Sequence, residues 1–514
     1  MLVIYHNNNR ITKVVSGENC LLPFDNKKVI SEGLYDLAVQ FPESKIVWCN
    51  EELEYYLNLK VIDTVFHHNK LMLSYSPAEI DFLGRKIGYV EESPFIKINK
   101  KVSYPTWQMS STVGVVHASL LLEIKDKIKM DADFDYYLNS VAKVCMPLGL
   151  LCYSEPQLLK AFEGSIVSTP ISNYTLFKFV KQHYKKRWQI LLLLNLIVFE
   201  KEFPLLPLIF SIFYKTRKND QINLETIFVQ SILQTTVDNT IDVIIPTIGR
   251  KKELYNVLND LRNQTHLPIN VIIVEQNPLS NSESELGFLH NEDWPFLINH
   301  TFTHQVGACN ARNLALSQVV SEWVFLNDDD NRLEKNLLQD FLFKAEKFGA
   351  QVVTTSYLQK NEVQHYNTIH QSGIFGSGNS FVKKRALADI RFDMALEFGY
   401  GEDTDFGMQL RNKGFDIIYF PELRVLHLKA PFGGFRIKIE QLWEAEIIQP
   451  KPSPTVLYVM NKNNTAEQLS CYKLVLFLKL LKKQSLQSCF GFLKLFQKKW
   501  DVSLYWSNQL NKND

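Results

Sequence analysis

Three consecutive acids, Asp328, Asp329 and Asp330, form the group in this sequence whose chemistry best suits a metal ion. They directly follow the apolar run 323–326, which predicts a buried strand. Clustered carboxylates at the C-terminal end of a central strand suit a hard divalent cation that also contacts phosphate oxygens. A solvated acidic loop is the alternative, and the position at a strand end favours the metal site.

A second group of acids, Glu402, Asp403 and Asp405, opens a predicted helix that ends at Gly414. Acids in a first turn also interact favourably with the helix dipole, which would explain one of the three. A carboxylate held at a helix start near a metal can accept the proton of an attacking hydroxyl, so we expect a general base here. His427 is either a further metal ligand or an ordinary core or surface histidine.

The elements that must position these acids alternate between strands and helices. The predicted order is strand 241–247, helix 251–264, strand 271–274, helix 311–318, strand 323–326, helix 333–348 and strand 351–355. Such alternation predicts an α/β fold with an open, mostly parallel sheet and flanking helices. Its ligand is expected beyond the C-terminal ends of the strands, where the first acidic group lies.

The chain from about residue 239 to 428 resembles the family 2 glycosyltransferases of GT-A fold. The similarity is carried by Pro246-Thr247-Ile248-Gly249-Arg250, Glu275-Gln276, Gly307 to Asn313, Asp328-Asp329-Asp330, Gly376 to Asn379, Gly401-Glu402-Asp403 and His427. Each motif is short, but they occur in the family's order and on the expected elements.

The resemblance implies roles for individual residues. The nucleotide pocket would be lined by Thr247, Arg250, Glu275 and Arg312, with Asp328 in contact with the nucleoside. Mn²⁺ or Mg²⁺ on the diphosphate would be held by Asp329, Asp330 and His427. Asp403 would be the catalytic base, with Glu402 beside it. Asn327 stands where many members carry the first Asp of their acidic motif, so the register of the metal ligands among Asp328 to Asp330 stays open.

The function implied is an inverting, metal-dependent glycosyltransferase. It would move a sugar from a nucleoside diphosphate sugar to a saccharide or lipid-linked saccharide acceptor, in bacterial surface polysaccharide or glycolipid synthesis. One alternative is a nucleotidyltransferase, although residues 247–250 are too short for its glycine-rich loop. The other is a non-catalytic carbohydrate-binding or scaffold protein built from decayed GT-A domains.

The first 165 residues repeat parts of the later domain. Residues 46–53 align with 323–330, and 133–159 align with 403–426, which places Asp133 beside Asp403. We therefore expect a divergent, non-catalytic GT-A-like domain, with an unrelated α/β domain as the alternative. The predicted divisions are 1–165 for this domain, 166–237 for a helical linker, 238–430 for the catalytic domain and 431–514 for a basic amphipathic helical region.

Composition limits the partners and the compartment. The 514 residues include 56 Lys and Arg against 55 Asp and Glu, so a nucleic-acid partner is not expected. Seven scattered cysteines without a CxxC pair favour a reducing compartment and predict neither a disulfide framework nor a zinc site. No run is apolar enough to predict a transmembrane helix. These features predict a cytoplasmic protein, and the oligomeric state is not readable.

The segment 471–500 is rich in lysine among Leu and Phe at helical spacing, and residues 185–218 form an apolar segment with basic flanks. Such stretches fit helices that lie on an anionic membrane, here the inner face of the plasma membrane. Helices packed on the domains with their lysines in water are the equal alternative.

Overall fold

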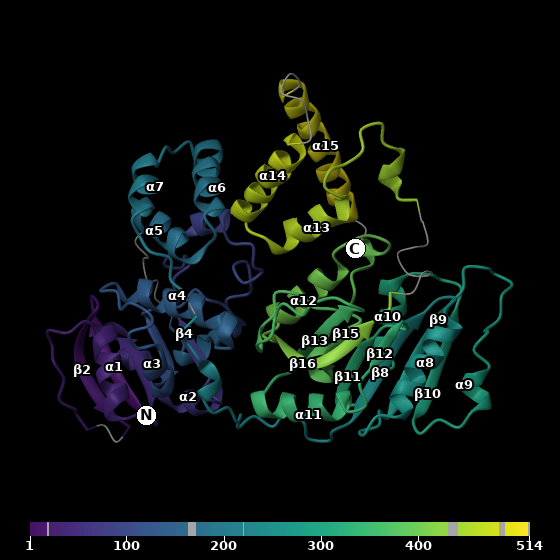
Figure 1. Ribbon diagram of the computed structural model, residues 1–514, viewed down its shortest axis with the longest axis horizontal. Helices are drawn as coiled ribbons and strands as arrows, with labels where there is room; N and C mark the ends of the chain where they lie inside the picture. Colours follow the sequence, from purple (N-terminus) through teal and green to yellow (C-terminus); the bar gives the residue numbers. More distant parts are fainter. Residues whose placement is uncertain (18–19, 163–170, 219, 430–439, 483–488, 512–514) are drawn as a thin grey trace. The chain divides into compact units, whose positions relative to one another are not determined.

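The computed structural model describes residues 1–17, 20–162, 171–218, 220–429, 440–482 and 489–511 (Figure 1). The chain forms two compact units. The first unit comprises Met1–Leu233, Thr368–Gln371 and Asn464–Leu476, and the second comprises Gln234–Asn367, Ser372–Asn463 and Phe477–Asp514. Each unit is built on its own sheet.

The second unit contains the elements predicted to carry the acids. Its strands are β8 (Ile241–Thr247), β9 (Asn270–Gln276), β10 (Leu297–Thr303), β11 (Trp323–Asn327), β12 (Asn331–Leu333), β13 (Val352–Gln359), β15 (Asn379–Lys383) and β16 (Ile417–His427). Its helices are α8 (Lys251–Arg262), α9 (Phe288–Asn291), α10 (Ala308–Leu316), α11 (Leu337–Phe348), α12 (Glu402–Asn412), α13 (Pro454–Asn463), α15 (Cys489–Leu510) and the end of α14 (Ala466–Leu481).

The sheet of the second unit confirms the predicted open, mostly parallel α/β architecture. Its strands lie in the order β10-β9-β8-β11-β15-β13-β16-β12. The first four are parallel to one another, and β13 is parallel to β16. The prediction missed β15, which runs antiparallel between β11 and β13. The four parallel strands therefore end at one edge, where Glu275, Thr247 and Asp328 follow one another on β9, on β8 and after β11.

Helices cover both faces of this sheet. The side chains along β11 alternate between the two faces, and both sets are apolar. Val324 and Leu326 pack in one apolar core with α10 and α12. On the opposite face Phe325 stacks on Phe381 at a centroid distance of 4.2 Å, and Phe341 of α11 stacks on Phe381 at 3.8 Å. This alternation decides where the acids that follow β11 point.

The first unit has a mixed sheet of its own. Its strands are β1 (Leu2–Asn7), β2 (Arg10–Ser16), β3 (Lys45–Asn50), β4 (Leu71–Tyr75), β5 (Tyr104–Pro105), β6 (Val113–His117) and β7 (Leu151–Ser154). The short strand β14 (His370–Gln371) is not part of this sheet. Its helices are α1 (Ile30–Gln40), α2 (Leu59–Val65), α3 (Ala118–Ile124), α4 (Phe134–Cys145), α5 (Asn173–His183), α6 (Arg187–Asn195) and α7 (Leu205–Ser211).

The two sheets share a core of five strands with the same order and directions. In the first unit β1 is parallel to β3, β6 is antiparallel to β3 and β4, and β4 is parallel to β7. In the second unit β8, β11, β15, β13 and β16 repeat these relations. This topology supports the interpretation of the first unit as a copy of the second, over an unrelated α/β domain.

The alignment predicted for the two copies is displaced by one residue in β3. Trp48 lies in the core that contains α4, and its ring contacts Phe134. The corresponding core of the second unit contains Leu326, whereas the prediction placed Trp48 beside Phe325. A shift of one residue turns every side chain of a strand to the other face, so Trp48 has to be aligned with Leu326 and not with Phe325. With this shift Asn50 corresponds to Asp328, and Glu51 corresponds to Asp329.

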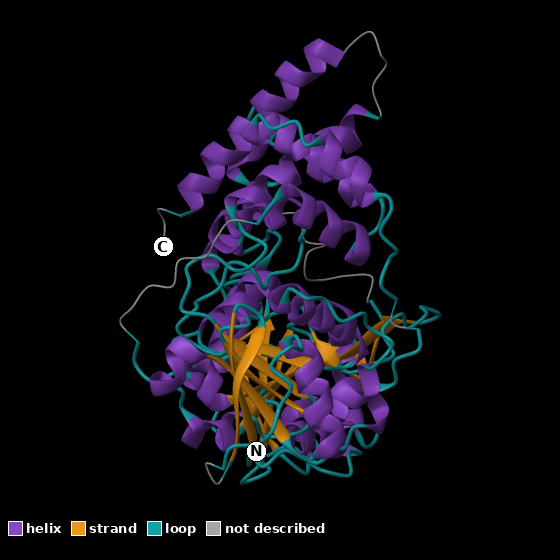
Figure 2. Ribbon diagram, turned by 90° about the vertical axis from the view of Figure 1, so that its left-hand side faces the viewer, coloured by secondary structure: helices purple, strands orange, loops and turns teal. Residues whose placement is uncertain are grey.

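The predicted helical linker contains α5, α6 and α7, and the predicted tail contains α13, α14 and α15, with non-helical segments between these helices (Figure 2). Helices α5 and α6 belong to the first unit, since Phe177, Phe179 and Leu192 lie in its main core. In the tail, Phe477 contacts Phe496 at a centroid distance of 5.3 Å, and Phe496 is buried. The tail aromatics therefore pack against one another. Residues 483–488 of the predicted amphipathic tail lie outside the described residues.

Candidate active site

The acids that follow β11 point to opposite sides of the sheet. Asp328 continues the alternation of Val324 and Leu326 toward α10 and α12, and Asp329 continues that of Phe325. The two carboxylates consequently meet different partners. The sequence treated Asp328 to Asp330 as one group, and the structure separates them.

Asp329 is buried in a network with the first strand and the helix that follows it. Its Oδ2 accepts a hydrogen bond from Thr247 Oγ1 at 2.7 Å, and its Oδ1 lies 2.5 Å from Arg250 Nη1. The same guanidinium nitrogen lies 3.3 Å from Asp330 Oδ2. Burial acts to lower the pKa of Arg250, but Asp329 and Asp330 outweigh it and raise that pKa. A positive charge thus already lies between Asp329 and Asp330.

Asp328 faces the second arginine of the site. Its Oδ1 lies 3.0 Å from Arg312 Nη2, and its Oδ2 accepts a hydrogen bond from Tyr357 Oη at 3.1 Å. The Asp328 side chain is 26% exposed, against 3% for Asp329 and 4% for Asp330. Asp328 is therefore the carboxylate of the three that a bound molecule can reach.

Helix α10 carries Arg312, and hydrogen bonds to Glu397 hold the N-terminus of this helix in place. Gly307 precedes the helix at φ +142°, a conformation that favours glycine, and a Cβ there would lie 2.3 Å from the Glu397 carboxylate. That carboxylate accepts hydrogen bonds from the backbone N–H groups of Cys309 and Asn310 at 3.1 and 2.8 Å. An acid at a helix N-terminus satisfies N–H groups that lack partners within the helix. Arg312 therefore follows a first turn that Glu397 anchors.

Asp403 has the environment expected of a base. The hydroxyl and the backbone N–H of Ser377 donate to its carboxylate, while Oδ1 is buried and has no hydrogen-bond partner among the described residues. Burial raises the pKa of Asp403, and Arg312 together with Ser377 opposes that rise. The residue as a whole is partly exposed.

Of the two neighbouring acids, only Glu402 is available for chemistry. Burial, with a contribution from Asp403, raises the pKa of Glu402 to about 7. Asp405 is instead a structural residue: its carboxylate lies 3.0 Å from Lys462 Nζ and accepts from Asn463 Nδ2 at 3.2 Å. Both partners belong to α13, so that helix holds the first turn of α12 in place.

Glu275 lies at the end of β9, paired across the strands with Thr247. Its Oε2 accepts a hydrogen bond from Ser284 Oγ at 2.5 Å and lies 2.9 Å from His300 Nε2. The carboxylate is buried among these partners. It lines the same sheet edge as Thr247, as the sequence predicts, and the loop after β9 shields it.

His427 lies at the end of β16, beside the acidic group. Its ring stacks on Tyr357 at a centroid distance of 4.7 Å, and its Nε2 lies 3.5 Å from Asp330 Oδ1. Within the part of the chain that the structure describes, no three His, Cys, Asp or Glu side chains converge as metal ligands. The predicted set Asp329, Asp330 and His427 thus stays a prediction, with Arg250 already paired to both acids.

Two side chains that contact the candidate acids were not singled out from the sequence. Ser377 lies in the segment Gly376 to Asn379, which carried the family resemblance, so a signal was present without an assignment. Tyr357 at the end of β13 gave none. It donates to Asp328 or Asn331, and Asn331 itself donates to the backbone carbonyl of Gly378 at 2.8 Å.

We expect Ser377→Ala to move the acidic limb of the pH–rate profile to higher pH. The lost hydroxyl favours the carboxylate form of Asp403, so its removal raises the pKa of that group. A base works only when deprotonated, and higher pH is then needed for the same rate. The measurement is kcat/KM against pH, with the exposed Thr404→Ala as control. An unchanged limb would show that Asp403 is not the titrating group.

The first unit retains counterparts of two of these contacts. Asn7 Nδ2 donates to Glu51 at 2.5 Å, as Thr247 donates to Asp329. Its α1 buries residues in the same pattern as α10, and Leu34 takes the place of Arg312. The copy therefore keeps carboxylates at the strand end and lacks this arginine.

The counterpart of Asp403 in the first unit is Asp135, where the sequence alignment had placed Asp133. Asp135 accepts from the backbone N–H and the hydroxyl of Ser111 at 2.7 and 2.8 Å, as Asp403 does from Ser377. Burial raises the pKa of Asp135 to about 6. Asp133 instead caps α4, with its side chain accepting from the N–H of Tyr136.

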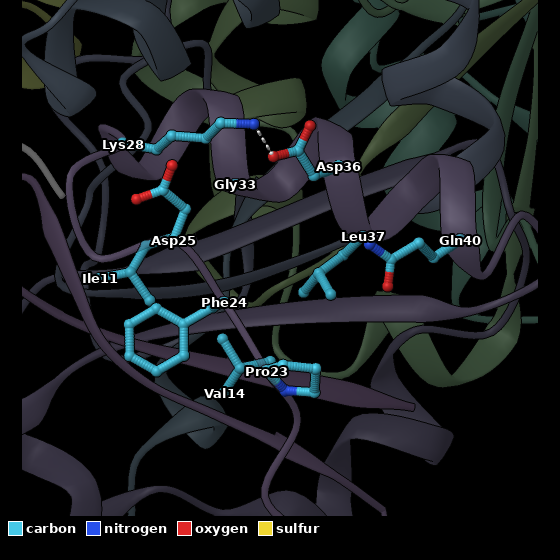
Figure 3. Close-up of a pocket in the computed structure, with 10 residues that line it drawn as sticks. All are labelled: Ile11, Val14, Pro23, Phe24, Asp25, Lys28, Gly33, Asp36, Leu37 and Gln40. Carbon is cyan, nitrogen blue, oxygen red and sulfur yellow. Dashed lines mark hydrogen bonds and ion pairs between the residues drawn. The ribbon is translucent and has the colours of Figure 1, made fainter.

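A cavity of about 380 Å³ lies in the first unit, between β2, α1 and residues 23–28 (Figure 3). Its wall is apolar on one side, with Val14, Phe24 and Leu37, and an ion pair between Lys28 and Asp36 lines the other. None of the predicted site residues lines this cavity.

Part of this chain is similar to a known protein family. Residues 242–398 match the model of the family described as Glycosyl transferase family 2. A curated relative, the glycosyltransferase GlyG of Streptococcus pneumoniae serotype 4, is 23% identical over 122 residues, which are 24% of this chain and 40% of GlyG. The chain thus matches about two fifths of the length of this relative.

Two solved structures show a low similarity to this chain. The S. aureus TarS fragment 1–349 in complex with UDP-GlcNAc is 18% identical at a TM-score of 0.35, over 46% of this chain and 70% of that one. GalNAc-T7 with UDP, GalNAc and Mn²⁺ is 13% identical at a TM-score of 0.32, over 41% and 48%. The assignment rests on the family model, which spans β8 to the segment before α12. The similarity of this chain to glycosyltransferase family 2 is therefore carried by residues 242–398.

Proposed function

We propose that the chain is an inverting glycosyltransferase that moves a sugar from a nucleoside diphosphate sugar to a hydroxyl of a saccharide or lipid-linked saccharide. The observation that supports this most is the carboxylate of Asp403, with one unpartnered buried oxygen beside Arg312. The family match supports glycosyl transfer as the reaction. Synthesis of a bacterial surface polysaccharide or glycolipid is the proposed context.

The donor is proposed to bind at the edge where β8, β9 and β11 end. Thr247, Glu275 and Asp328 lie there on adjacent strands, and Arg250 and Arg312 supply positive charge. Bound diphosphate would compete with the carboxylates for these two guanidinium groups, whose planar donors suit phosphate oxygens. Asp328 would contact the nucleoside through its exposed edge.

In the proposed reaction the acceptor oxygen attacks C1 of the sugar as the bond from C1 to the diphosphate oxygen breaks. The hydroxyl proton passes to the unpartnered Oδ1 of Asp403, and the nucleoside diphosphate leaves with the bonding electron pair. Arg312 favours the ionised form of Asp403 before the reaction and lies near the growing negative charge. A single displacement inverts the configuration at C1.

A divalent cation is part of the proposal, with Asp328 as its protein ligand. Asp329 and Asp330 fit this role poorly because their side chains are buried, whereas that of Asp328 is accessible. Mg²⁺ in such sites is commonly held by one or two carboxylates together with substrate phosphates, so a single accessible acid is enough. When bound, the cation would neutralise charge on the diphosphate.

We expect Mn²⁺ to increase the melting temperature of the wild-type protein in the presence of its nucleoside diphosphate, and Asp328→Asn to abolish that increase. Ligand that binds only the folded state stabilises it by mass action, about 2.7 kcal/mol at a hundredfold excess over Kd. Asp340→Asn, an exposed acid at the start of α11, is the matched control. Equal stabilisation with EDTA in both proteins would contradict the metal role.

The activity itself is tested by a panel of nucleoside diphosphate sugars. Hydrolysis of one donor in the absence of acceptor, with release of the nucleoside diphosphate, is the expected result. Release of pyrophosphate would instead indicate a nucleotidyltransferase. Binding of sugars without turnover of any donor would indicate a carbohydrate-binding protein.

The first unit is proposed to be a non-catalytic copy. Leu34 stands in the place of Arg312. Glu51, the counterpart of Asp329, accepts a hydrogen bond from Asn7, whereas Asp329 is paired with Arg250. Without these cations a diphosphate would lose its main electrostatic partners. The unit would then serve packing, acceptor binding or assembly.

Contact with an anionic membrane completes the proposal and would place the enzyme at the inner face of the plasma membrane, beside a lipid-linked acceptor. The described helices include none that is long and apolar enough to cross a bilayer. The proposed contact is therefore one with the membrane surface.

A further inference from the structure

The first unit carries a pair of short helical segments with an unusual distribution of apolar side chains. Residues 187–214, named here the apolar hairpin, contain α6, a π-helical turn (Leu196–Glu200) that continues it, and α7. In Figure 1 α6 and α7 lie side by side and are joined at one end by a loop. The hairpin was noted in the sequence for its apolar content and its basic flanks.

The outward side of the hairpin is apolar. Eight of its large apolar residues are at least 50% exposed: Ile190, Phe203, Leu205, Leu206, Ile209, Phe210, Ile212 and Phe213. A concentration of this kind within 25 residues differs from the scattered exposed apolar residues that any protein surface has. It indicates a surface that another apolar phase covers.

Packing within the first unit leaves these side chains at least half exposed, although Phe210 contacts the ring of Tyr174. The inward side of α6 is already buried, since Trp188, Leu192 and Leu196 lie in the main core of the unit. A surface helix normally has a polar outer face. The hairpin is therefore apolar both on the face that packs in the core and on the face that is exposed.

The charges around the outer face are positive. Lys185 and Lys186 precede α6, and Lys215 and Lys218 follow α7; all four are exposed, and Lys218 lies 3.9 Å from the exposed Asp220. The acids of the hairpin have partners in the protein: Glu202 lies 2.7 Å from Lys86 Nζ, and Glu200 accepts from Tyr89 Oη at 2.5 Å. The charge left to the surroundings complements a negatively charged surface.

The length of the hairpin fixes how it can meet a bilayer. Its α6 has nine residues, the π-helical turn five and α7 seven, whereas a spanning helix needs about 20 apolar residues. An apolar surface with lysines at its margin instead suits the boundary between headgroups and acyl chains.

We propose that the apolar hairpin is the membrane-docking surface of this protein and inserts into the interface of an anionic lipid bilayer. This inference builds on the membrane contact of the proposed function and assigns it to a surface other than the lysine-rich tail. In the tail, Phe477, Phe492 and Phe496 contact one another, so that part of its apolar content is already packed.

The test is flotation of the full chain with vesicles of equal parts phosphatidylcholine and phosphatidylglycerol, and with phosphatidylcholine alone. The hairpin variant combines Leu206→Glu, Ile209→Glu and Phe213→Glu. The matched tail variant combines Leu493→Glu, Leu495→Glu and Tyr505→Glu, which are exposed apolar residues of α15 with the same change of charge. Melting temperature and donor hydrolysis are measured on each protein.

We expect the hairpin variant to bind anionic vesicles at least about tenfold more weakly than wild type, because three apolar anchors become charged. The tail variant should bind like wild type, and the melting temperatures should agree. Loss of flotation in the tail variant alone, or no flotation of wild type, would overturn the assignment. A wild-type dimer without lipid that becomes a monomer in the hairpin variant would overturn it in favour of a self-interface. Donor hydrolysis reports on the glycosyltransferase separately from all of these outcomes.

Discussion

Replacing Asp403 by Asn is expected to lower kcat by about 10²- to 10⁴-fold, the usual contribution of a positioned base, and to leave donor binding unchanged. The amide keeps the size of the side chain, and its oxygen can still accept from Ser377. Its NH₂ group then lies where the unpartnered Oδ1 was, and cannot take a proton. Arg312 retains Asp328 as its partner, so the donor site should persist.

The measurement is single-turnover transfer together with donor binding by calorimetry, with Glu402→Gln as the matched neighbour. A smaller loss in the neighbour is expected, since Glu402 lacks the Ser377 contacts of Asp403. Activity of Asp403→Asn within a few-fold of wild type would move the base to Glu402. Asp405 is no alternative, because Lys462 and Asn463 occupy its carboxylate.

Replacing Asp329 by Ala is expected to lower the free energy of unfolding by about 3 kcal/mol, because it leaves a buried guanidinium without its main partner. Arg250 loses the contact at 2.5 Å, and Thr247 loses its acceptor. Asp330 still pairs with Arg250 at 3.3 Å, which keeps the loss at the lower end of the range for broken buried pairs.

The comparison is urea unfolding of Asp329→Ala against Asp340→Ala, an exposed acid of α11. The double variant Asp329→Ala, Arg250→Met should lose less than the sum of the two single variants, because the residues are partners. A fold as stable as wild type, together with lost metal-dependent binding, would instead restore Asp329 as the metal ligand.

Much of the second unit follows from local patterns in the sequence. The β-branched run 241–247 coincides with β8, and helix 333–348 was predicted four residues too long at its start, since α11 begins at Leu337. Strand and helix periods depend on neighbouring residues, so a single sequence contains them. The two acidic groups and their place at strand and helix ends followed from the same patterns, as did the family resemblance.

Longer-range pairings were beyond these patterns. The insertion of β15 between β11 and β13, and the register of the two copies, depend on hydrogen bonds between strands far apart in the chain. A one-residue difference in register changes which face a side chain joins, and apolar content alone does not distinguish Phe325 from Leu326 as the counterpart of Trp48.

The sequence by itself determined that carboxylates lie at the C-terminal edge of an α/β sheet and at the start of a helix beside it. Only the tertiary structure decided their division of labour. Asp328 meets Arg312 and stays accessible, Asp329 is buried against Arg250, and Asp403 is held by Ser377. The physical reason is that the pKa and the accessibility of a carboxylate depend on its burial and on the charges that packing brings close to it. The arginine partners of Asp328 and Asp329 lie 16 and 79 residues away from them along the chain.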